Sequence, residues 1–250
     1  MVERFFRLPQ IDFHSPRDDG NHPSQPQILL VSGPPSCGKS SLLFQFAFNS
    51  ASHGTSSSST CSTVVFLCNR RKLETNPPFL SQGIDPSSQV FERIQMKYVD
   101  DDEGIKKYFA GFHLHNSTFP ALVVIDDFAD FFDQRNCQER YGNARGRELA
   151  MVRVLALCQN ALSHANEAGW PCRLLLSDSQ HGDSPRFLYI YKRWVSSIYN
   201  IQGDGLGSFL LKNTYQSGLT DAARRTKSAK YSISLQFLVL ESITEDDRQL

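Results

Sequence analysis

Short apolar runs bounded by turn-forming residues recur along the chain. Four of them are nearly apolar throughout, which predicts strands buried on both faces of a sheet: residues 27–32, 63–68, 120–126 and 173–177. In residues 94–98, Ile94, Met96 and Tyr98 alternate with polar neighbours, which predicts a strand with one wetter face. Two later runs, 206–211 and 231–240, predict further strands in an antiparallel arrangement.

Segments with a helical repeat separate these runs. Apolar residues recur at the spacing of a helix face in residues 40–50, 105–112 and 147–168. The longest segment has an apolar stripe formed by Met151, Leu155, Cys158 and Leu162. Gly169 and Pro171 follow it as stop signals. Strands that alternate with helices predict an α/β fold, in which helices flank a mostly parallel central sheet that continues into C-terminal antiparallel strands.

Shifts in composition divide the chain. Residues 1–26 mix Pro, Asp, His and Ser without periodicity, which predicts a flexible lead-in. Residues 51–62 are almost all small and polar, so they bury too little apolar surface to offset the entropy of ordering and predict a low-complexity insertion. We therefore expect one domain over residues 27–241, interrupted by that insertion, and a C-terminal tail over 242–250.

The overall composition excludes several classes of protein. Lys plus Arg and Asp plus Glu number 26 each, so the net charge is zero and nucleic-acid binding has to come from a local patch. No run approaches the ~18 apolar residues of a membrane span, which predicts no membrane partner and no secretory signal. The six cysteines contain no C-x-x-C pair, which indicates reduced, intracellular thiols and no zinc site.

The motif G-x-x-x-x-G-K-[ST] lies between a predicted strand and a predicted helix. A loop of this kind binds phosphates through successive backbone N–H groups at the positive end of a helix. Gly38 permits close approach, Lys39 is expected to reach the β- and γ-phosphates, and Ser40 is expected to bind Mg²⁺. The plainer alternative is a turn before a helix, with the lysine facing solvent. The predicted nucleotide-binding residues are Gly33, Pro34, Pro35, Ser36, Cys37, Gly38, Lys39, Ser40 and Ser41.

Two acids, Asp126 and Asp127, follow an apolar run at the carboxyl end of a predicted strand, where ligands bind in open α/β sheets. Asp126 is expected to bind Mg²⁺, partly through water. Asp127 is a candidate for polarising an attacking water, so the catalytic candidates are Lys39 and Asp127. Adjacent strand residues point to opposite faces, so the two carboxylates are not expected to meet the same phosphate. For both acids the alternative is a simple helix start.

Cations interleaved with aromatic residues follow the fourth buried run. Arg186, Lys192 and Arg193 lie among aromatic side chains in residues 181–195, and such a mixture is typical of single-stranded nucleic-acid binding. The alternative is a helix with its arginines in water and a buried face formed by Leu188, Tyr191 and Val195. A second basic cluster, within residues 224–230, is predicted to lie in a loop that binds DNA, serves nuclear import or is only solvated.

These motifs resemble the ATPase core of RecA-type recombinases, which also carry a phosphate-binding motif with a proline after its first glycine, the run LVVID and a long helix followed by a run like RLLLS. Within that core, two segments resemble the small recombinase paralogues called SWIM-domain-protein-associated ATPases of Shu-type complexes. They are VFLCNRRKLETNPP (65–78) and DPSSQVFERIQMKYVDD (85–101). The likeness covers residues 27–212.

The resemblance implies a RecA-like P-loop NTPase core that binds ATP with Mg²⁺. It also implies a SWIM zinc-finger protein and recombinases or other recombinase paralogues as partners. A protein of this family would associate with single-stranded DNA and promote recombinase filaments in DNA repair by homologous recombination. A nuclear location is implied as well.

The sequence departs from the recombinase pattern at two positions. Recombinases carry a glutamate just after the second strand, where this chain has Arg70, and their Asn-Gln after the fourth strand is replaced by Ser-Asp-Ser-Gln at residues 177–180. We therefore expect weak ATP hydrolysis, or hydrolysis that uses Asp127. Two alternatives stay open: a P-loop small-molecule kinase, and a non-hydrolysing scaffold in which ATP stabilises a protein–protein interface. A Phe-x-x-Ala string at residues 44–47 is expected to pack within a helix.

Overall fold

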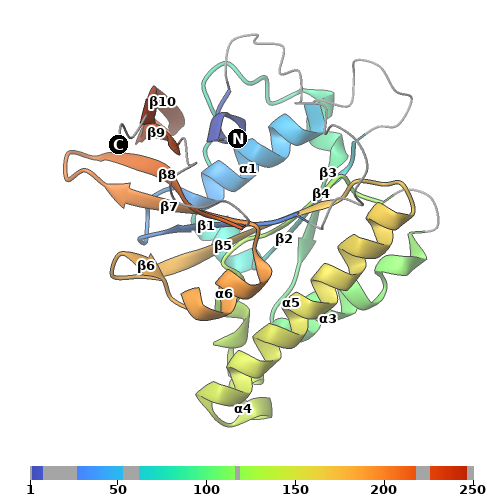
Figure 1. The fold of residues 1–250 in the computed structure, drawn as a ribbon. Helices are drawn as coiled ribbons and strands as arrows, with labels where there is room; N and C mark the ends of the chain where they lie inside the picture. The colour runs from blue at the N-terminus through green and yellow to red at the C-terminus, as the bar shows by residue number, and fades with distance from the viewer. Residues whose placement is uncertain (1, 8–26, 53–61, 116–118, 218–225, 247–250) are drawn as a thin grey trace.

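The structure is a computed structural model that describes residues 2–7, 27–52, 62–115, 119–217 and 226–246. Within these residues a ten-stranded sheet crosses the molecule, with helices on both of its faces (Figure 1). The central strands are parallel and the strands toward one edge are antiparallel. The predicted α/β class, with a mostly parallel sheet and C-terminal antiparallel strands, is therefore confirmed.

The sheet has the order β10-β9-β8-β7-β1-β5-β4-β2-β3, and β6 pairs with β5 beside this path. Along this order, β7, β1, β5, β4, β2 and β3 run parallel to one another. On the other side of β7, the strands β8, β9 and β10 follow in antiparallel pairs. The strand bounds are β1 Gln27–Gly33, β2 Val64–Cys68, β3 Ile94–Tyr98, β4 Leu122–Ile125, β5 Arg173–His181, β6 Ser184–Pro185, β7 Ser197–Gly203, β8 Ser208–Gln216, β9 Thr226–Ser234 and β10 Phe237–Asp246.

Three of the α-helices begin at side chains that satisfy their first N–H groups. Asn69, Asp101 and Asn143 accept hydrogen bonds from the first turns of α2, α3 and α5. The α-helices are α1 Lys39–Ser52, α2 Arg70–Thr75, α3 Asp102–Ala110, α4 Arg135–Tyr141, α5 Ala144–Glu167 and α6 Leu188–Trp194. Short 3₁₀ helices are η1 Val2–Phe5, η3 Gln89–Arg93, η4 Phe112–Leu114 and η5 Phe128–Phe132. None of the helices in the described ranges is long and apolar enough to cross a bilayer.

Alternate residues of the parallel strands face two separate cores. Ile28 and Leu30 of β1 point into a core built with α3, α5 and α6. Leu29 and Val31 point into the opposite core, which α1 and η1 cover (Figure 1). Because both faces of the sheet are covered, the central strands β1, β2 and β4 are apolar at nearly every position, as their sequence runs indicate, whereas the edge strand β3 is mostly exposed.

The register of the parallel strands brings three strand ends together. Gly33 at the end of β1 pairs with Ser179 of β5, and Ile125 at the end of β4 pairs with Leu176 of the same strand. β5 therefore lies between β1 and β4, and the loops that follow these strands meet at one edge of the sheet. Ligands of open α/β sheets bind at such an edge.

The expectation of a flexible lead-in over residues 1–26 is wrong for residues 2–7. Val2, Phe5 and Phe6 are almost completely buried, and the Phe5 ring lies 4.9 Å from the ring of Phe46 in α1 and 5.3 Å from Tyr199 in β7. The composition of residues 1–26 is polar on average, but the apolar residues at the start of this segment pack into the core that contains α1. Residues 8–26 lie outside the described residues.

Two other predicted boundaries also need correction. Residues 51 and 52, assigned to the low-complexity insertion, continue α1, while 53–61 lie outside the described residues. The predicted tail begins too early, because β10 continues to residue 246 through its pairing with β9. Within the second basic cluster, Lys227 and Lys230 lie in β9 rather than in a loop, and each forms ion pairs with two carboxylates. The arginines at 224 and 225 are not among the described residues.

The burial of η1 predicts that Phe5→Ala destabilises the protein. Truncation of a fully buried Phe side chain costs about 3–5 kcal/mol, and urea unfolding measures this loss. Leu206→Ala is the matched control, because Leu206 is 88% exposed and its truncation should cost less than about 0.5 kcal/mol. A Phe5→Ala variant as stable as the control would mean that the N-terminal segment does not belong to the core.

Candidate functional site

The loop from Gly33 to Ser40 joins the end of β1 to the start of α1. Ser36 and Gly38 both have positive φ, at 60° and 81°. Alternating left-handed and right-handed residues form the backbone nests that bind anions, and a left-handed serine is otherwise unfavourable. A Cβ at position 33 would lie 2.6 Å from Cys37 Sγ and 2.9 Å from Ile201, so only glycine fits there. Positive φ angles next to a helix N-terminus are a feature that anion-binding loops share.

The side chain of Lys39 turns into this loop rather than toward solvent, unlike the lysine of the plainer alternative for the motif. The residue is only 9% exposed, and its Nζ donates to the carbonyl oxygens of Gly33 and Pro34 at 3.3 and 3.2 Å. Both acceptors are neutral, and no carboxylate pairs with Lys39 among the described residues. The charge of Lys39 acts on Asp126 at a distance and counters the rise in the pKa of that acid. The positive charge of the loop is therefore only partly balanced and suits an anion.

Asp126 lies directly after β4 and meets the loop across β5. Its carboxylate accepts hydrogen bonds from the hydroxyls of Ser40, at 2.6 Å, and of Ser177 in β5, at 2.7 Å. Burial, with the charge of Asp127 added, raises the pKa of Asp126. A hydroxyl and a carboxylate side by side are hard oxygen ligands of the kind that Mg²⁺ takes. The predicted pair of Ser40 and Asp126 is therefore brought together, whereas Ser177 was not predicted.

Asp127 is held apart from Asp126. Its φ is +52°, which turns the chain sharply after β4, and its carboxylate accepts from Lys72 Nζ of α2 at 3.1 Å. Lys72 also pairs with Asp130 of η5. Partial burial acts to lower the pKa of Lys72, but the two carboxylates together raise it. Asp127 is thus an ion-paired carboxylate in this structure, and Lys72 is a second cation that sequence reasoning missed.

These groups line one cavity of about 450 Å³. Its polar end carries Lys39, Ser40, Asp126 and Asp127. Its other walls are more apolar and come from three separate segments. They are Leu73 of α2, residues 76–79 and Ile233 of β9. The segment that carries the wall at residues 76–79 is hydrogen-bonded to α1. The backbone N–H of Phe79 donates to Ser41 Oγ and that of Ser81, just beyond the wall, donates to Gln45 Oε1, both at 2.9 Å.

The C-terminal strands pack against the loop itself. Tyr231 of β9 donates its hydroxyl hydrogen bond to the carbonyl of Cys37 at 2.7 Å. Ile233, two residues further, approaches so closely that its Cδ1 would lie 2.5 Å from a Cβ at position 38. The positive φ therefore favours glycine at 38, and a larger residue there would also have to displace the end of the Ile233 side chain. No local pattern in the sequence marks the two β9 residues as part of the site.

The expected departures from the recombinase pattern lie close to this cavity. Arg70, where a glutamate was expected, begins α2 and pairs with Glu74 at 2.8 Å on the exposed side of the helix. Neither residue lines the cavity. At the end of β5, Gln180 Nε2 donates to the carbonyl of Ser32 at 3.2 Å, and Ser179 lines the cavity. The buried Asp178 accepts from the Tyr191 hydroxyl at 2.8 Å, and burial raises the pKa of Asp178 to about 6.

The three candidate DNA-binding cations differ in their surroundings. Arg186 forms ion pairs with Asp130, Asp133 and Asp178, so its charge is already balanced. Lys192 and Arg193 lie exposed in the last turn of α6, and neither forms an ion pair with a residue that the structure describes. The buried positions of Tyr191 and Val195 agree with the helix alternative for this segment.

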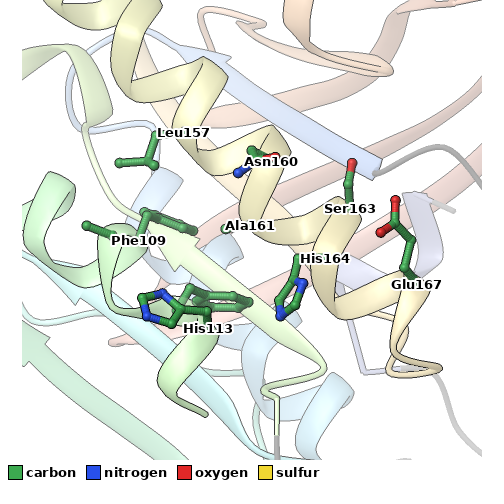
Figure 2. A pocket seen from close by; sticks show the side chains of 10 residues that line it. Phe109, His113, Leu157, Asn160, Ala161, Ser163, His164 and Glu167 are labelled. Carbon is green, nitrogen blue, oxygen red and sulfur yellow. The ribbon is translucent and has the colours of Figure 1, made fainter. Parts of the chain in front are cut away.

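A second cavity, of about 280 Å³, lies between α5 and the segment formed by α3 and η4. Figure 2 shows the rings of Phe109 and His113 on one side of it and His164 and Glu167 of α5 on the other. It contains none of the predicted site residues. Over the described ranges, no cluster of three or more His, Cys, Asp or Glu side chains is placed to hold a metal ion.

The contact between Gly38 and Ile233 predicts that Gly38→Ala destabilises the protein more than Gly142→Ala. Both glycines have positive φ, which costs alanine about 1–2 kcal/mol, but nothing lies within 4 Å of a Cβ at 142. Because the atom in the way is the free end of the Ile233 side chain, its displacement at 38 should add about 0.5–1.5 kcal/mol in urea unfolding. The double variant Gly38→Ala with Ile233→Ala should no longer show this additional cost of Gly38→Ala. Equal costs at 38 and 142 in the wild-type background would show that β9 does not press on the loop.

Comparison with known proteins leaves the chain without an assigned family. No protein-family model matches it, and no curated protein gives a significant match. The function proposed below therefore depends on the geometry of this site and on the motifs in the sequence.

Proposed function

We propose that this chain is an ATP-binding, weakly hydrolysing subunit with a RecA-like P-loop core, a recombinase paralogue that acts with a SWIM zinc-finger protein on single-stranded DNA. The observation that carries the nucleotide part is the buried Lys39 ammonium, which faces neutral carbonyls within a loop of anion-binding geometry. A phosphate chain would supply the missing negative charge. It would also accept hydrogen bonds from N–H groups at the start of α1, where the helix dipole is positive.

The residues present fit a magnesium-bound nucleotide. Ser40 and Asp126 would hold the ion, in part through water, and the ion would offset phosphate charge and lower the pKa of Asp126. The cavity of about 450 Å³ lies in the size range of small-molecule sites. Its more apolar walls, with Pro77, Pro78 and Ile233, suit the flat face of a nucleoside base. These walls include residues 73 and 76–78, which belong to a segment that resembles the Shu-type paralogues.

The hydrogen bonds and ion pairs of the carboxylates that line the cavity support slow ATP hydrolysis. The Asp126 carboxylate accepts hydrogen bonds from two hydroxyls, and Asp127 and Asp130 both form ion pairs with Lys72. Among the described residues that line the cavity, no carboxylate is left without a partner to polarise a water molecule. This observation favours a second candidate function from the sequence, the scaffold that binds ATP without turning it over. In both cases ATP binding is the activity on which the protein depends.

The macromolecular part of the proposal rests on the resemblance of residues 27–212 to recombinase paralogues. Lys192 and Arg193 are the exposed cations that would contact DNA phosphates, whereas Arg186 already forms ion pairs with three carboxylates. In this proposal the protein works in the nucleus with recombinases or other paralogues, and promotes recombinase filaments during homologous recombination. ATP would stabilise the form of the chain that its partners bind.

Lys39→Ala should weaken Mg-ATP binding. A charged hydrogen bond contributes about 1.5–3 kcal/mol, so the dissociation constant should rise about 10- to 140-fold in isothermal titration calorimetry. Lys107→Ala, which removes an exposed lysine of α3 outside the site, should leave the constant unchanged. Equal affinities for Lys39→Ala and wild type would contradict the assignment of the loop.

Lys72→Met should increase ATP hydrolysis, because it releases Asp127 from its ion pair. A general base contributes roughly 10²–10⁴-fold, so a rise of about tenfold in phosphate release is expected even from an imperfectly placed carboxylate. Asp127→Asn should have no effect alone and should abolish the increase in the double variant. Fast wild-type turnover that falls on Asp127→Asn would show instead that Asp127 already serves as the base.

A further inference from the structure

A third cavity, of about 520 Å³, lies between α5 and α6. It shares no residue with the cavity that Lys39 and Asp126 line. The two helices lie side by side in Figure 1. Leu149 and Val152 of α5 form one wall, and Tyr189, Ile190 and Trp194 of α6 form the other. We call this feature the α5–α6 groove. Its walls are mainly apolar, although it opens onto the surface.

The apolar side chains of the groove are unusually exposed. Leu149 is 49% and Tyr189 is 58% exposed, and both are among the few large apolar residues on the surface of the described chain. On α5, Leu149, Val152 and Ala156 are spaced by three and four residues, so they form a stripe along one side of the helix. An exposed apolar stripe beside a second helix is typical of a surface that packs against a partner.

The rim of the groove carries positive charge. Arg145 and Arg193 line it, and Arg153 and Lys192 are exposed one turn or one residue away. None of these four cations forms an ion pair with any residue in the described ranges. Other arginines of the same region differ, since Arg135, Arg140, Arg147 and Arg186 all pair with carboxylates. The charge around the groove is therefore unbalanced in a protein whose net charge is zero.

One acid lies among these cations, and the aliphatic α5 wall of the groove argues against a nucleic acid as its occupant. Glu148 lines the groove and accepts a hydrogen bond from the Tyr189 hydroxyl, and burial and this carboxylate together raise the pKa of Tyr189 to about 12. This single carboxylate leaves the four cations around the groove in excess. Leu149 and Val152 of the α5 wall are aliphatic, so only the α6 wall, with Tyr189 and Trp194, offers rings on which bases could stack.

We propose that the α5–α6 groove binds an amphipathic helix of a partner protein, one that presents apolar anchors at helical spacing and acidic residues on both flanks. The anchors would fill the space between Leu149 and Trp194, and the acids would balance the arginines at the rim. Grooves between two helices receive helices in this way, through residues at i, i+3, i+4 and i+7. The proposal concerns a surface separate from the nucleotide site and does not depend on nucleotide binding. It uses Arg193 at the rim, so a helix bound here would compete with the DNA contact proposed above for that residue.

Fluorescence anisotropy with a labelled model helix tests this assignment. The probe is a peptide of about 18 residues with leucines three and four apart and glutamates at most other positions, which we call the Leu/Glu peptide. A Leu/Lys peptide of the same pattern is the charge-reversed probe. At about 0.15 M salt, the full-length protein should bind the Leu/Glu peptide at least about tenfold more tightly than the Leu/Lys peptide.

Matched variants locate the binding. Leu149→Glu should weaken binding of the Leu/Glu peptide by about tenfold or more, because a central anchor contact is lost. Leu206→Glu places the same charge at an exposed leucine outside the groove and should have no effect. Arg145→Glu with Arg193→Glu should reverse the preference toward the Leu/Lys peptide. Circular dichroism melting of each variant shows whether it remains folded. Lys39→Ala should bind as wild type, which separates this test from that of the nucleotide site.

Three results would overturn the proposal. The first is equal binding of both peptides, or binding that Leu149→Glu leaves unchanged. The second is displacement of the Leu/Glu peptide by an oligo-dT single strand whose own binding requires Leu149, which would assign the groove to nucleic acid. The third is a dimer in sedimentation that Leu149→Glu dissociates, which would make a second copy of the chain the occupant.

Discussion

The ammonium group of Lys39 turns into its own loop and donates to two neutral carbonyl oxygens. This positive charge, which forms no direct ion pair with a carboxylate of the described residues, organises the site. Burial of an ion without a partner is costly, so a fold retains such a group only where something else offsets the cost. The start of α1 adds partial positive charge of the same sign. Asp126 and Asp127 stand opposite. A positive loop that faces an acidic strand end is an arrangement that suits a phosphate chain and a divalent cation together.

The sheet creates this arrangement by its strand order. β5 lies between β1 and β4, so Ser40 and Asp126 approach each other across a neighbouring strand, with Ser177 beneath them. The antiparallel strands at the C-terminus have a part in the same site. Through Tyr231 and Ile233, β9 contacts the loop from the side opposite the acids. The extension of the sheet therefore shapes the cavity as well as enlarging the core.

Local signals account for what the sequence could predict. Apolar runs and helical repeats identify most of the strands and helices, because each element is buried in a regular way. The loop from Gly33 to Ser40 and the acid at 126 were found because a motif coincides with a strand end. β7, with its polar Ser197 and Asn200 inside an otherwise buried strand, was not recognised. The buried face of the N-terminal segment was missed because three apolar residues in a polar stretch form no repeat.

The remaining site residues depend on contacts between distant parts of the chain. Lys72 looks like a solvated lysine of a short charged helix until Asp127 and Asp130 are seen beside it. Arg186 matches the composition of a DNA-binding segment, yet three carboxylates from other elements neutralise it. Ion pairs of this kind decide whether a charge is available to a ligand, and no spacing in the sequence encodes them.

A crystal structure of the protein with Mg²⁺ and a non-hydrolysable ATP analogue tests the central claim most directly. The account predicts that Lys39 Nζ leaves the carbonyl oxygens of Gly33 and Pro34 and contacts the phosphates. It also predicts that Ser40 and Asp126 separate to hold the metal ion between them. A loop that stays as it is here at saturating nucleotide, with Lys39 still bound to its own backbone, would contradict the account.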